Sequence, residues 1–323
     1  MNKELSSKIT NANVLFTIFV VCLHARPSNL GVYHIVGTIA DAAVPNFFVI
    51  SSYLYFSSFC WEETCKSYFS KIKKRICSLL IPYLIFCAIG FLVITVKHLF
   101  KHEQLPYDIY SFQSIIRYWI LGKGNPPLWY LTSLFEFVLF APIIGYLVKL
   151  TKYSFFLIPL SAIACNSLNY SNILFWMPVL LLGAYCYYWE RVVSAFFLKF
   201  GNFPMVAVIM LLILFCCYFY GLDNRNIWQY YVYRMIVPVI FIVVYSKINI
   251  LPSSIVDNLK QYALFIYCVH YILLQLISPI LKNISPFIGY AFKVIATIVI
   301  AYSIGTLFKI YFPRLWNILV GGR

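Results

Sequence analysis

The sequence has little charge, and acidic residues are especially scarce. Of its 323 residues, 11% are charged, 62% are hydrophobic and only 10 are Asp or Glu. The mean hydropathy is +0.83. A soluble domain of this size needs a polar surface, so the composition excludes that class of protein. The chain is therefore predicted to be an integral membrane protein.

The sequence also lacks the alternation of polar and apolar residues that is typical of membrane β-barrels, because its apolar runs are continuous. Backbone groups in lipid must be satisfied internally, so these runs are predicted to be spanning α-helices. We expect an all-α, polytopic membrane protein with about ten transmembrane helices around a central cavity. The predicted segments are residues 12–26, 36–57, 77–98, 128–148, 154–169, 172–189, 203–221, 229–246, 262–281 and 287–308.

Internal repeats, low-complexity tracts and an appended soluble domain are absent, so we expect a single membrane-embedded domain over residues 1–323. The 10 cysteines form no CxxC pair, and most lie inside apolar runs. They are interpreted as small hydrophobic residues, and no metal site is expected. No small-residue cleavage site follows the first apolar run, so this run is expected to be a retained helix.

The net charge of +15 comes from 25 Lys and Arg residues that cluster between apolar segments. In a soluble protein this charge would suggest a nucleic-acid partner. Here the positive-inside effect explains it better, and it predicts a multi-pass protein of the cell (inner) membrane with both termini cytoplasmic. Membrane lipids are the expected partners, and nucleic acid is not. The expected cytoplasmic loop at 66–75 carries five basic residues, and the longest outer connection, residues 99–127, is a candidate cover.

His24 is the first candidate for chemistry, because it ends the apolar run NVLFTIFVVCLHA. A histidine in such a helix is costly unless it lines a cavity or has a partner. The alternative is an interfacial histidine without a catalytic role.

Four further residues are candidates for the cavity wall. Glu136 and Arg234 are single charges inside apolar runs, where such residues usually face the bundle interior and pair, so they are candidate partners. His270 lies inside the ninth segment, where a hydrogen-bonded structural histidine is the simpler interpretation. Trp129 begins the fourth segment, where an interfacial aromatic belt would explain it.

Five motifs, in order along the chain, resemble the acyltransferase 3 family of membrane-bound acyl-transfer enzymes. They are VLFTIFVVCLHA, VPNFFVISSYLYF, KIKKRICSLLIPYLIF, PPLWYLTSLF and LFIYCVHYILL. Together they span residues 13 to 274, which is nearly the whole chain. Two positions depart from the family pattern: Asn13 stands where the family usually has Arg or Lys, and Ser52 replaces a glycine. Lys8 is a candidate for the missing charge.

The resemblance implies O-acylation of a carbohydrate, such as a surface polysaccharide or its lipid-linked precursor. The implied donor is a cytoplasmic acyl-coenzyme A, with acetyl-coenzyme A expected. His24 would act as a general base on the acceptor hydroxyl, or would form a transient acyl-histidine. Arg75, Lys74 and Lys73 would clamp the phosphates of coenzyme A, with Asn13 nearby. Alternatively, the basic residues only anchor the chain to anionic lipid.

Two other functions remain open at this point. A transporter or flippase for a lipid-linked glycan would show repeat symmetry between its halves, which the sequence does not display. A non-catalytic membrane sensor is compatible with the departure at Asn13. For the enzyme, we expect Asn13 and His24, about 16 Å apart along a helix, to line one continuous cavity with Glu136 or His270.

Overall fold

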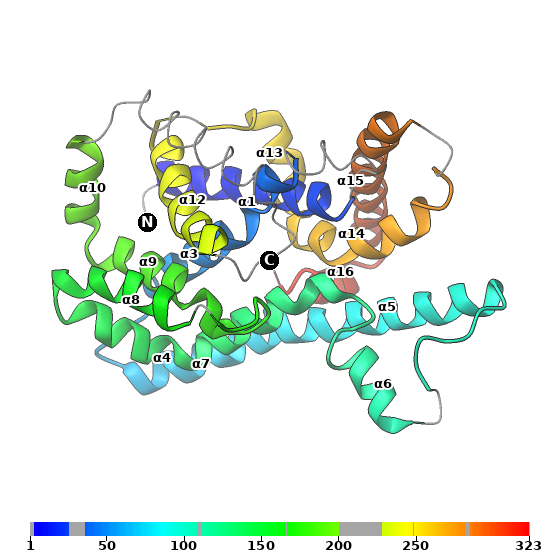
Figure 1. The fold of residues 1–323 in the computed structure, drawn as a ribbon, viewed down its shortest axis with the longest axis horizontal. Coiled ribbons are helices and arrows are strands. Elements are labelled where there is room, and N and C mark those ends of the chain that lie inside the picture. The colour runs from blue at the N-terminus through cyan, green and yellow to red at the C-terminus, as the bar shows by residue number, and fades with distance from the viewer. Residues whose placement is uncertain are drawn as a thin grey trace.

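The computed structural model describes residues 3–25, 36–108, 111–165, 167–199, 228–247, 249–281 and 285–322. Over these ranges the chain is helical and forms no β-strand, which confirms the predicted all-α class. Figure 1 shows the arrangement of the helices. The α-helices are α1 (Lys3–His24), α3 (Ala43–Phe56), α4 (Thr64–Arg75), α5 (Ile81–Phe100), α6 (Phe112–Trp119), α7 (Trp129–Lys149), α8 (Leu157–Ala164), α9 (Met177–Tyr188), α10 (Glu190–Lys199), α12 (Trp228–Lys247), α13 (Ser253–Leu259), α14 (Ala263–Ile277), α15 (Pro286–Tyr311) and α16 (Pro313–Leu319).

Shorter helical turns complete the fold. They are the π-helical turn η1 (Ile76–Leu80) and the 3-10 turns η2 (Pro126–Leu128), η3 (Lys152–Phe156) and η4 (Ile173–Trp176).

Fewer helices are long enough to span a membrane than the sequence predicted. By length and composition, five described helices qualify, or six if α13 and α14, which meet at 76°, form one bent span. α9 has 12 residues and α8 has 8, so at 1.5 Å per residue neither crosses a core of about 30 Å alone. The expected segment 203–221 lies outside the described residues. The structure therefore supports a multi-pass membrane protein without clearly showing ten spans.

The basic segment 66–75 is a helix rather than the expected loop. It belongs to α4, which continues through η1 into α5. Pro82, near the start of α5, cannot donate the hydrogen bond that a regular α-helix would send back to the Ser78 carbonyl. The π-helical turn lies at this position, and such turns are frequent at functional sites. The basic side chains therefore project from a helix and not from a loop.

α3 and α9 pack closely along their length. A Cβ atom on Gly183 of α9 would lie 2.4 Å from the Val49 carbonyl oxygen of α3, so only glycine permits this approach. Next to it, the buried Ser52 hydroxyl donates to the Leu180 carbonyl at 2.7 Å. Ser52 is therefore accommodated because the glycine stands on the opposite helix. This contact fixes α3, which forms one wall of the site.

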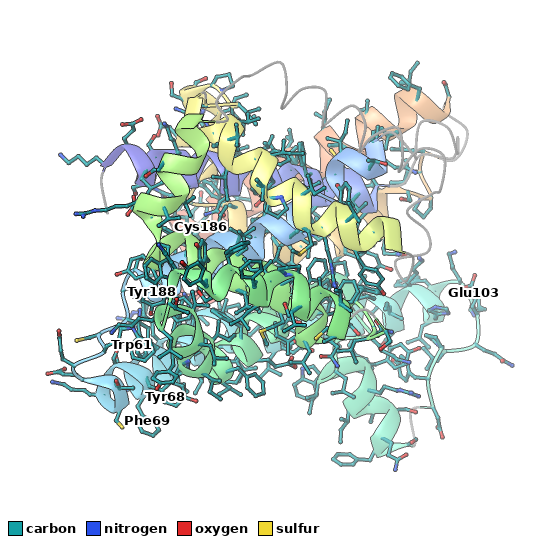
Figure 2. All side chains as sticks on the ribbon, turned by 60° about the vertical axis from the view of Figure 1, so that its left-hand side comes forward. Trp61, Tyr68, Phe69, Glu103, Cys186 and Tyr188 are labelled. Atoms are coloured by element: carbon teal, nitrogen blue, oxygen red, sulfur yellow. The ribbon has the colours of Figure 1, made fainter. Side chains whose placement is uncertain are left out.

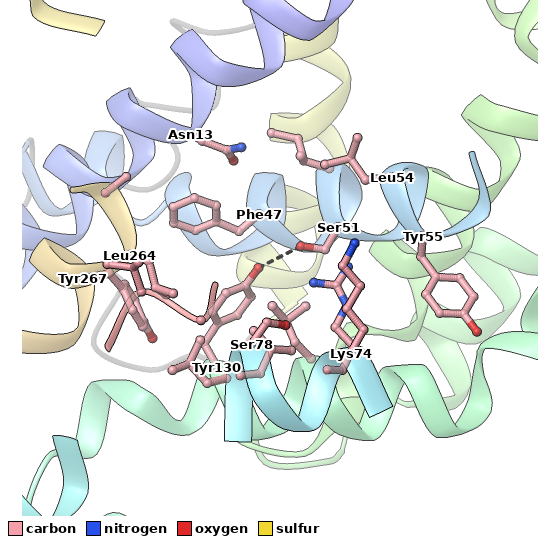
Figure 3. A pocket seen from close by; sticks show the side chains of 18 of the residues that line it. Asn13, Phe47, Ser51, Leu54, Tyr55, Lys74, Ser78, Tyr130, Leu264 and Tyr267 are labelled. Carbon is pink, nitrogen blue, oxygen red and sulfur yellow. Dashed lines mark hydrogen bonds between the residues drawn. The ribbon is translucent and has the colours of Figure 1, made fainter. Parts of the chain in front are cut away.

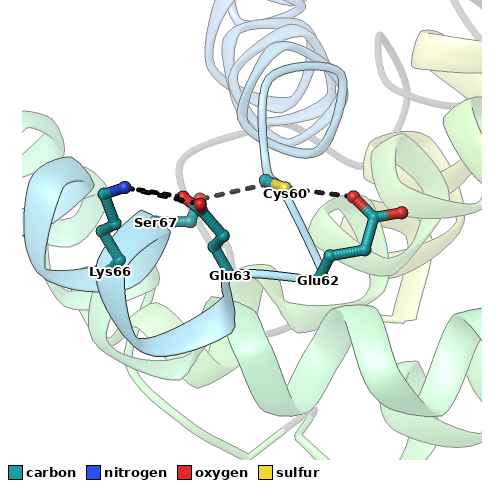
Figure 4. A network of polar contacts seen from close by, with 5 residues as sticks. All are labelled: Cys60, Glu62, Glu63, Lys66 and Ser67. Carbon is teal, nitrogen blue, oxygen red and sulfur yellow. Dashed lines mark hydrogen bonds and ion pairs between the residues drawn. The ribbon is translucent and has the colours of Figure 1, made fainter.

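The turn from α3 to α4 is held at both ends. Trp61 donates its indole N–H to the Tyr188 hydroxyl at the end of α9, at 2.7 Å (Figure 2). On the α4 side, the Cys60 backbone N–H donates to the Ser67 hydroxyl at 3.1 Å, and Lys66 forms an ion pair with Glu63 at 3.2 Å (Figure 4). These contacts position the start of α4 against the bundle.

The long connection 99–127 folds back along α5. Gly124 lies so close to this helix that a Cβ atom would be 2.8 Å from the Phe91 backbone nitrogen. The Tyr83 hydroxyl donates to the Ile120 carbonyl at 2.8 Å. α6 projects away from the bundle at the lower right of Figure 1, and no described residue of 99–127 lines the cavity discussed next.

Candidate functional site

A cavity of about 590 Å³ lies where α1, α3, α4, η1, α7 and α14 meet (Figure 3). Its volume is within the range of small-molecule and cofactor sites. The turn after α16 completes its wall with Val320, Gly321 and Gly322. Segments from both ends of the chain therefore build a single site.

The described lining of this cavity is positively charged. Among the described residues, four cationic side chains contribute to it, Lys71, Lys74, Arg75 and Lys260, and no Asp or Glu does. The Lys71 ammonium group hydrogen-bonds Ser58 and lies 5.3 Å from the centre of the Tyr55 ring. Three of these cations, Lys71, Lys74 and Arg75, belong to α4, so one basic face of this helix is turned toward the cavity. Such an excess of cations suits a ligand with several negative charges.

α1 contributes only neutral side chains to the cavity. They are Thr10, Asn13, Val14 and Thr17, one face of the helix over two turns. Lys8 does not supply the charge that Asn13 lacks, because its ammonium group forms an ion pair with Glu4 at 2.8 Å and is not part of the lining. The cations of α4 are therefore the main positive charges facing Asn13 across the cavity.

Aromatic rings close the end of the cavity away from the α4 cations. Phe47, Tyr130 and Tyr267 line it there, with Tyr130 5.6 Å from Phe47 and 5.9 Å from Tyr267 between ring centroids. The hydroxyls of Tyr130 and Ser51 are hydrogen-bonded at 3.2 Å (Figure 3). Tyr267 donates its hydroxyl to the Pro127 carbonyl. Hydrogen bonds to α3 and to η2 thus hold Tyr130 and Tyr267 in place.

Two histidines lie directly behind this aromatic end. The ring of His270 is 5.8 Å from that of Tyr267 and 5.2 Å from that of His24, between centroids. His24 is half-buried at the end of α1, while His270 is fully buried. Neither lines the cavity, contrary to the expected continuous passage, because the rings stand between. His24 is nevertheless three helical turns beyond Asn13 on the same face of α1.

The structure brings together some of the predicted site residues and leaves others apart. Asn13, Lys74 and Arg75 line the same cavity, although they are far apart in sequence. Lys73 is exposed and does not line it. Trp129 is also outside the lining and stacks on Trp176, with ring centroids 6.0 Å apart.

Glu136 and Arg234 neither line this cavity nor pair with each other. Glu136 lies on the exposed face of α7 together with Leu139 and Ile143. The opposite face of α7, which includes Phe137 and Val138, is buried and lines the cavity. Arg234 is fully buried, lies 3.7 Å above the Phe175 ring and donates to the Phe175 carbonyl. A buried cation can be held in this way by ring and carbonyl contacts.

Several residues that line the cavity were not predicted from the sequence. Lys71 is one of the five basic residues of segment 66–75. The sequence could not distinguish it from Lys73, because only the structure shows that Lys71 lines the cavity and Lys73 does not. Tyr130 directly follows Trp129 in the fourth motif, and from the sequence an interfacial aromatic belt would explain both residues. Gly321 gave no signal at all, because its role depends on contact with Ser78, far away in sequence.

No group of three or more His, Cys, Asp or Glu side chains within the described ranges is placed to hold a metal ion.

Comparison with known families decides the type of protein. A family model for an acyltransferase domain matches residues 9–306, nearly the whole chain. The chain belongs to the acyltransferase 3 family. This acyltransferase is an enzyme, and its apolar helices indicate a multi-pass membrane protein. No curated protein and no solved structure matches it.

Proposed function

We propose that this acyltransferase transfers an acetyl group from acetyl-coenzyme A to a hydroxyl group of a carbohydrate, such as a surface polysaccharide or its lipid-linked precursor. The observation that carries the donor assignment is the cavity whose described lining has four cationic side chains and no Asp or Glu. Coenzyme A bears several phosphate charges, and guanidinium and ammonium groups bind phosphate well. The carbohydrate acceptor follows from the resemblance to the family.

The donor would enter at the α4 side of the cavity. Arg75 and Lys74 would hold its phosphates there, and its thin pantetheine arm would follow Asn13 and Thr17 along α1. From Thr17 to His24 the same face of the helix continues for about 10 Å. The aromatic rings close this path, so rotation of Tyr130 or Tyr267 would have to admit the thioester.

His24 would act as the general base. It takes the proton of the acceptor hydroxyl as the oxygen attacks the thioester carbonyl carbon. The new carbon–oxygen bond forms and the carbon–sulfur bond breaks. The thiolate that leaves receives the proton from His24, which yields the ester and free coenzyme A. His24 would be held in place for this role at the end of α1, because its ring packs against those of His270 and Tyr271 on α14.

Turnover by the purified protein tests the proposal. The protein is reconstituted in lipid nanodiscs with radiolabelled acetyl-coenzyme A and membrane glycan extract, and labelled product is measured for the wild type and for His24→Ala. We expect label in the glycan fraction with the wild type only. A transporter or sensor would leave the thioester intact. Mass spectrometry of surface glycans from cells with and without the gene identifies the acceptor.

A further inference from the structure

The two ring nitrogens of His270 have different surroundings. Nδ1 lies 2.5 Å from the Tyr267 carbonyl oxygen. Because a carbonyl can only accept a hydrogen bond, Nδ1 carries the proton. Full burial inside an apolar helix favours the neutral imidazole. Nε2 therefore carries a lone pair, and within the described part of the chain it makes no hydrogen bond.

An acceptor that is buried without a partner is costly and calls for an explanation. The neighbouring imidazole offers one. The His24 ring is 5.2 Å from the His270 ring between centroids, with 41° between their planes. α1 and α14, which carry them, pack against each other. At this separation a small rotation of either ring brings a nitrogen of each within hydrogen-bond distance.

We infer that His270 is a positioning residue whose Nε2 accepts a hydrogen bond from a ring N–H of His24 during acyl transfer. The inference rests on the proposed role of His24 as the base. A bond to His270 selects the tautomer of His24, so its other nitrogen keeps the lone pair that takes the acceptor proton. Once that proton has moved, the His24 imidazolium continues to donate to His270. The bond therefore also stabilises the charge that develops in the transition state.

A purely structural role for His270 makes a different prediction. In that case the important contact is the one from Nδ1 to the Tyr267 carbonyl, which holds α14 in place. Two amide substitutions separate the roles. The side-chain N–H of His270→Asn can replace the Nδ1 donor but places no group near Nε2. The side-chain oxygen of His270→Gln can replace the Nε2 acceptor.

The experiment compares kcat and the donor KM of the wild type, His270→Phe, His270→Asn and His270→Gln, with detergent melting as the folding check. We expect kcat to fall about 10- to 100-fold in His270→Phe, as for lost orienting partners of metal-bound histidines. The donor KM should stay unchanged, since His270 does not line the cavity. His270→Gln should recover most of the loss, and His270→Asn should not. His98→Gln, on α5, controls for the substitution itself.

Recovery by His270→Asn but not by His270→Gln would overturn the inference in favour of the structural role. An unchanged kcat in a folded His270→Phe variant would also overturn it, and would leave the proposed function intact if His24→Ala is inactive. Turnover that survives His24→Ala would instead reject the proposed base, and the inference with it.

Discussion

Removing single cations from α4 should weaken donor binding in an order set by their position. Arg75 lines the cavity and is half-buried, whereas Lys74 lines it but is exposed. Lys73, next to both, is exposed and outside the lining. Each alanine substitution removes one positive charge from the same short segment. The long-range field is therefore matched, and only the contact with the cavity differs.

The expected magnitudes follow from burial. A hydrogen bond to a charged group contributes about 1.5–3 kcal/mol, and the lower end applies to a half-buried side chain. Arg75→Ala should therefore raise the donor KM roughly tenfold. An exposed ion pair contributes about 0.2–1 kcal/mol, so Lys74→Ala should raise it about 1.4- to 5-fold. Lys73→Ala should change it by less than either.

The assay measures transfer of radiolabelled acetyl at varied donor concentration, at low and at physiological salt. A radiolabel is preferable to a thiol-reactive dye because Cys60, Cys65 and Cys77 are exposed. The part of each rise in KM that comes from long-range electrostatic attraction should become smaller as salt rises, because salt screens exposed charges. An equal rise in KM for Lys73→Ala and Arg75→Ala would refute the assignment of phosphate binding to the cavity.

Three other outcomes are expected. His24→Ala should abolish transfer while detergent melting stays within a degree or so of the wild type, because it leaves the core unchanged; full activity would rule out the proposed base. Gly321→Ala should destabilise the protein and raise the donor KM, because the added Cβ would lie 2.5 Å from the Ser78 carbonyl oxygen. Gly322→Ala is the matched control, since Gly322 has a similar positive φ but open space around it. This control should lower stability only by the backbone strain of about 1–2 kcal/mol. Equal melting temperatures for the two alanine variants would show that the contact with Ser78 does not matter. Ser52→Ala should lower stability by about 1 kcal/mol through the lost hydrogen bond to α9, measured by thermal unfolding, and an unchanged midpoint would contradict this.

Composition and hydropathy were sufficient to predict the helical class, because every apolar run must satisfy its backbone internally. They could not predict how many runs become full spans. Hydropathy predicts one segment over 154–169, yet in the structure its first part is divided between η3 and the short α8. Whether neighbouring protein compensates for a short helix depends on tertiary packing, which the hydropathy of a single run does not contain.

The candidate site was predictable where the helical period fixes the side that a residue faces. Asn13 and His24 follow one face of α1, and the structure places Asn13 in the wall of the cavity. Period alone could not show which face of α7 turns inward, so Glu136 was expected in the interior but is exposed. Nor could it show that Tyr267 and Tyr130 would meet, since that contact joins helices separated by more than a hundred residues.

The position of the turn after α16 has a practical consequence for anyone who handles this protein. Val320, Gly321 and Gly322 lie in the wall of the cavity, and Gly321 is packed against Ser78. An affinity tag or fluorescent protein fused directly after Gly322 would start beside the cations of α4 and would compete with any ligand of the cavity for space. Purification tags, reporters and surface-immobilisation chemistry are therefore better attached at the other terminus, ahead of Lys3, where α1 begins.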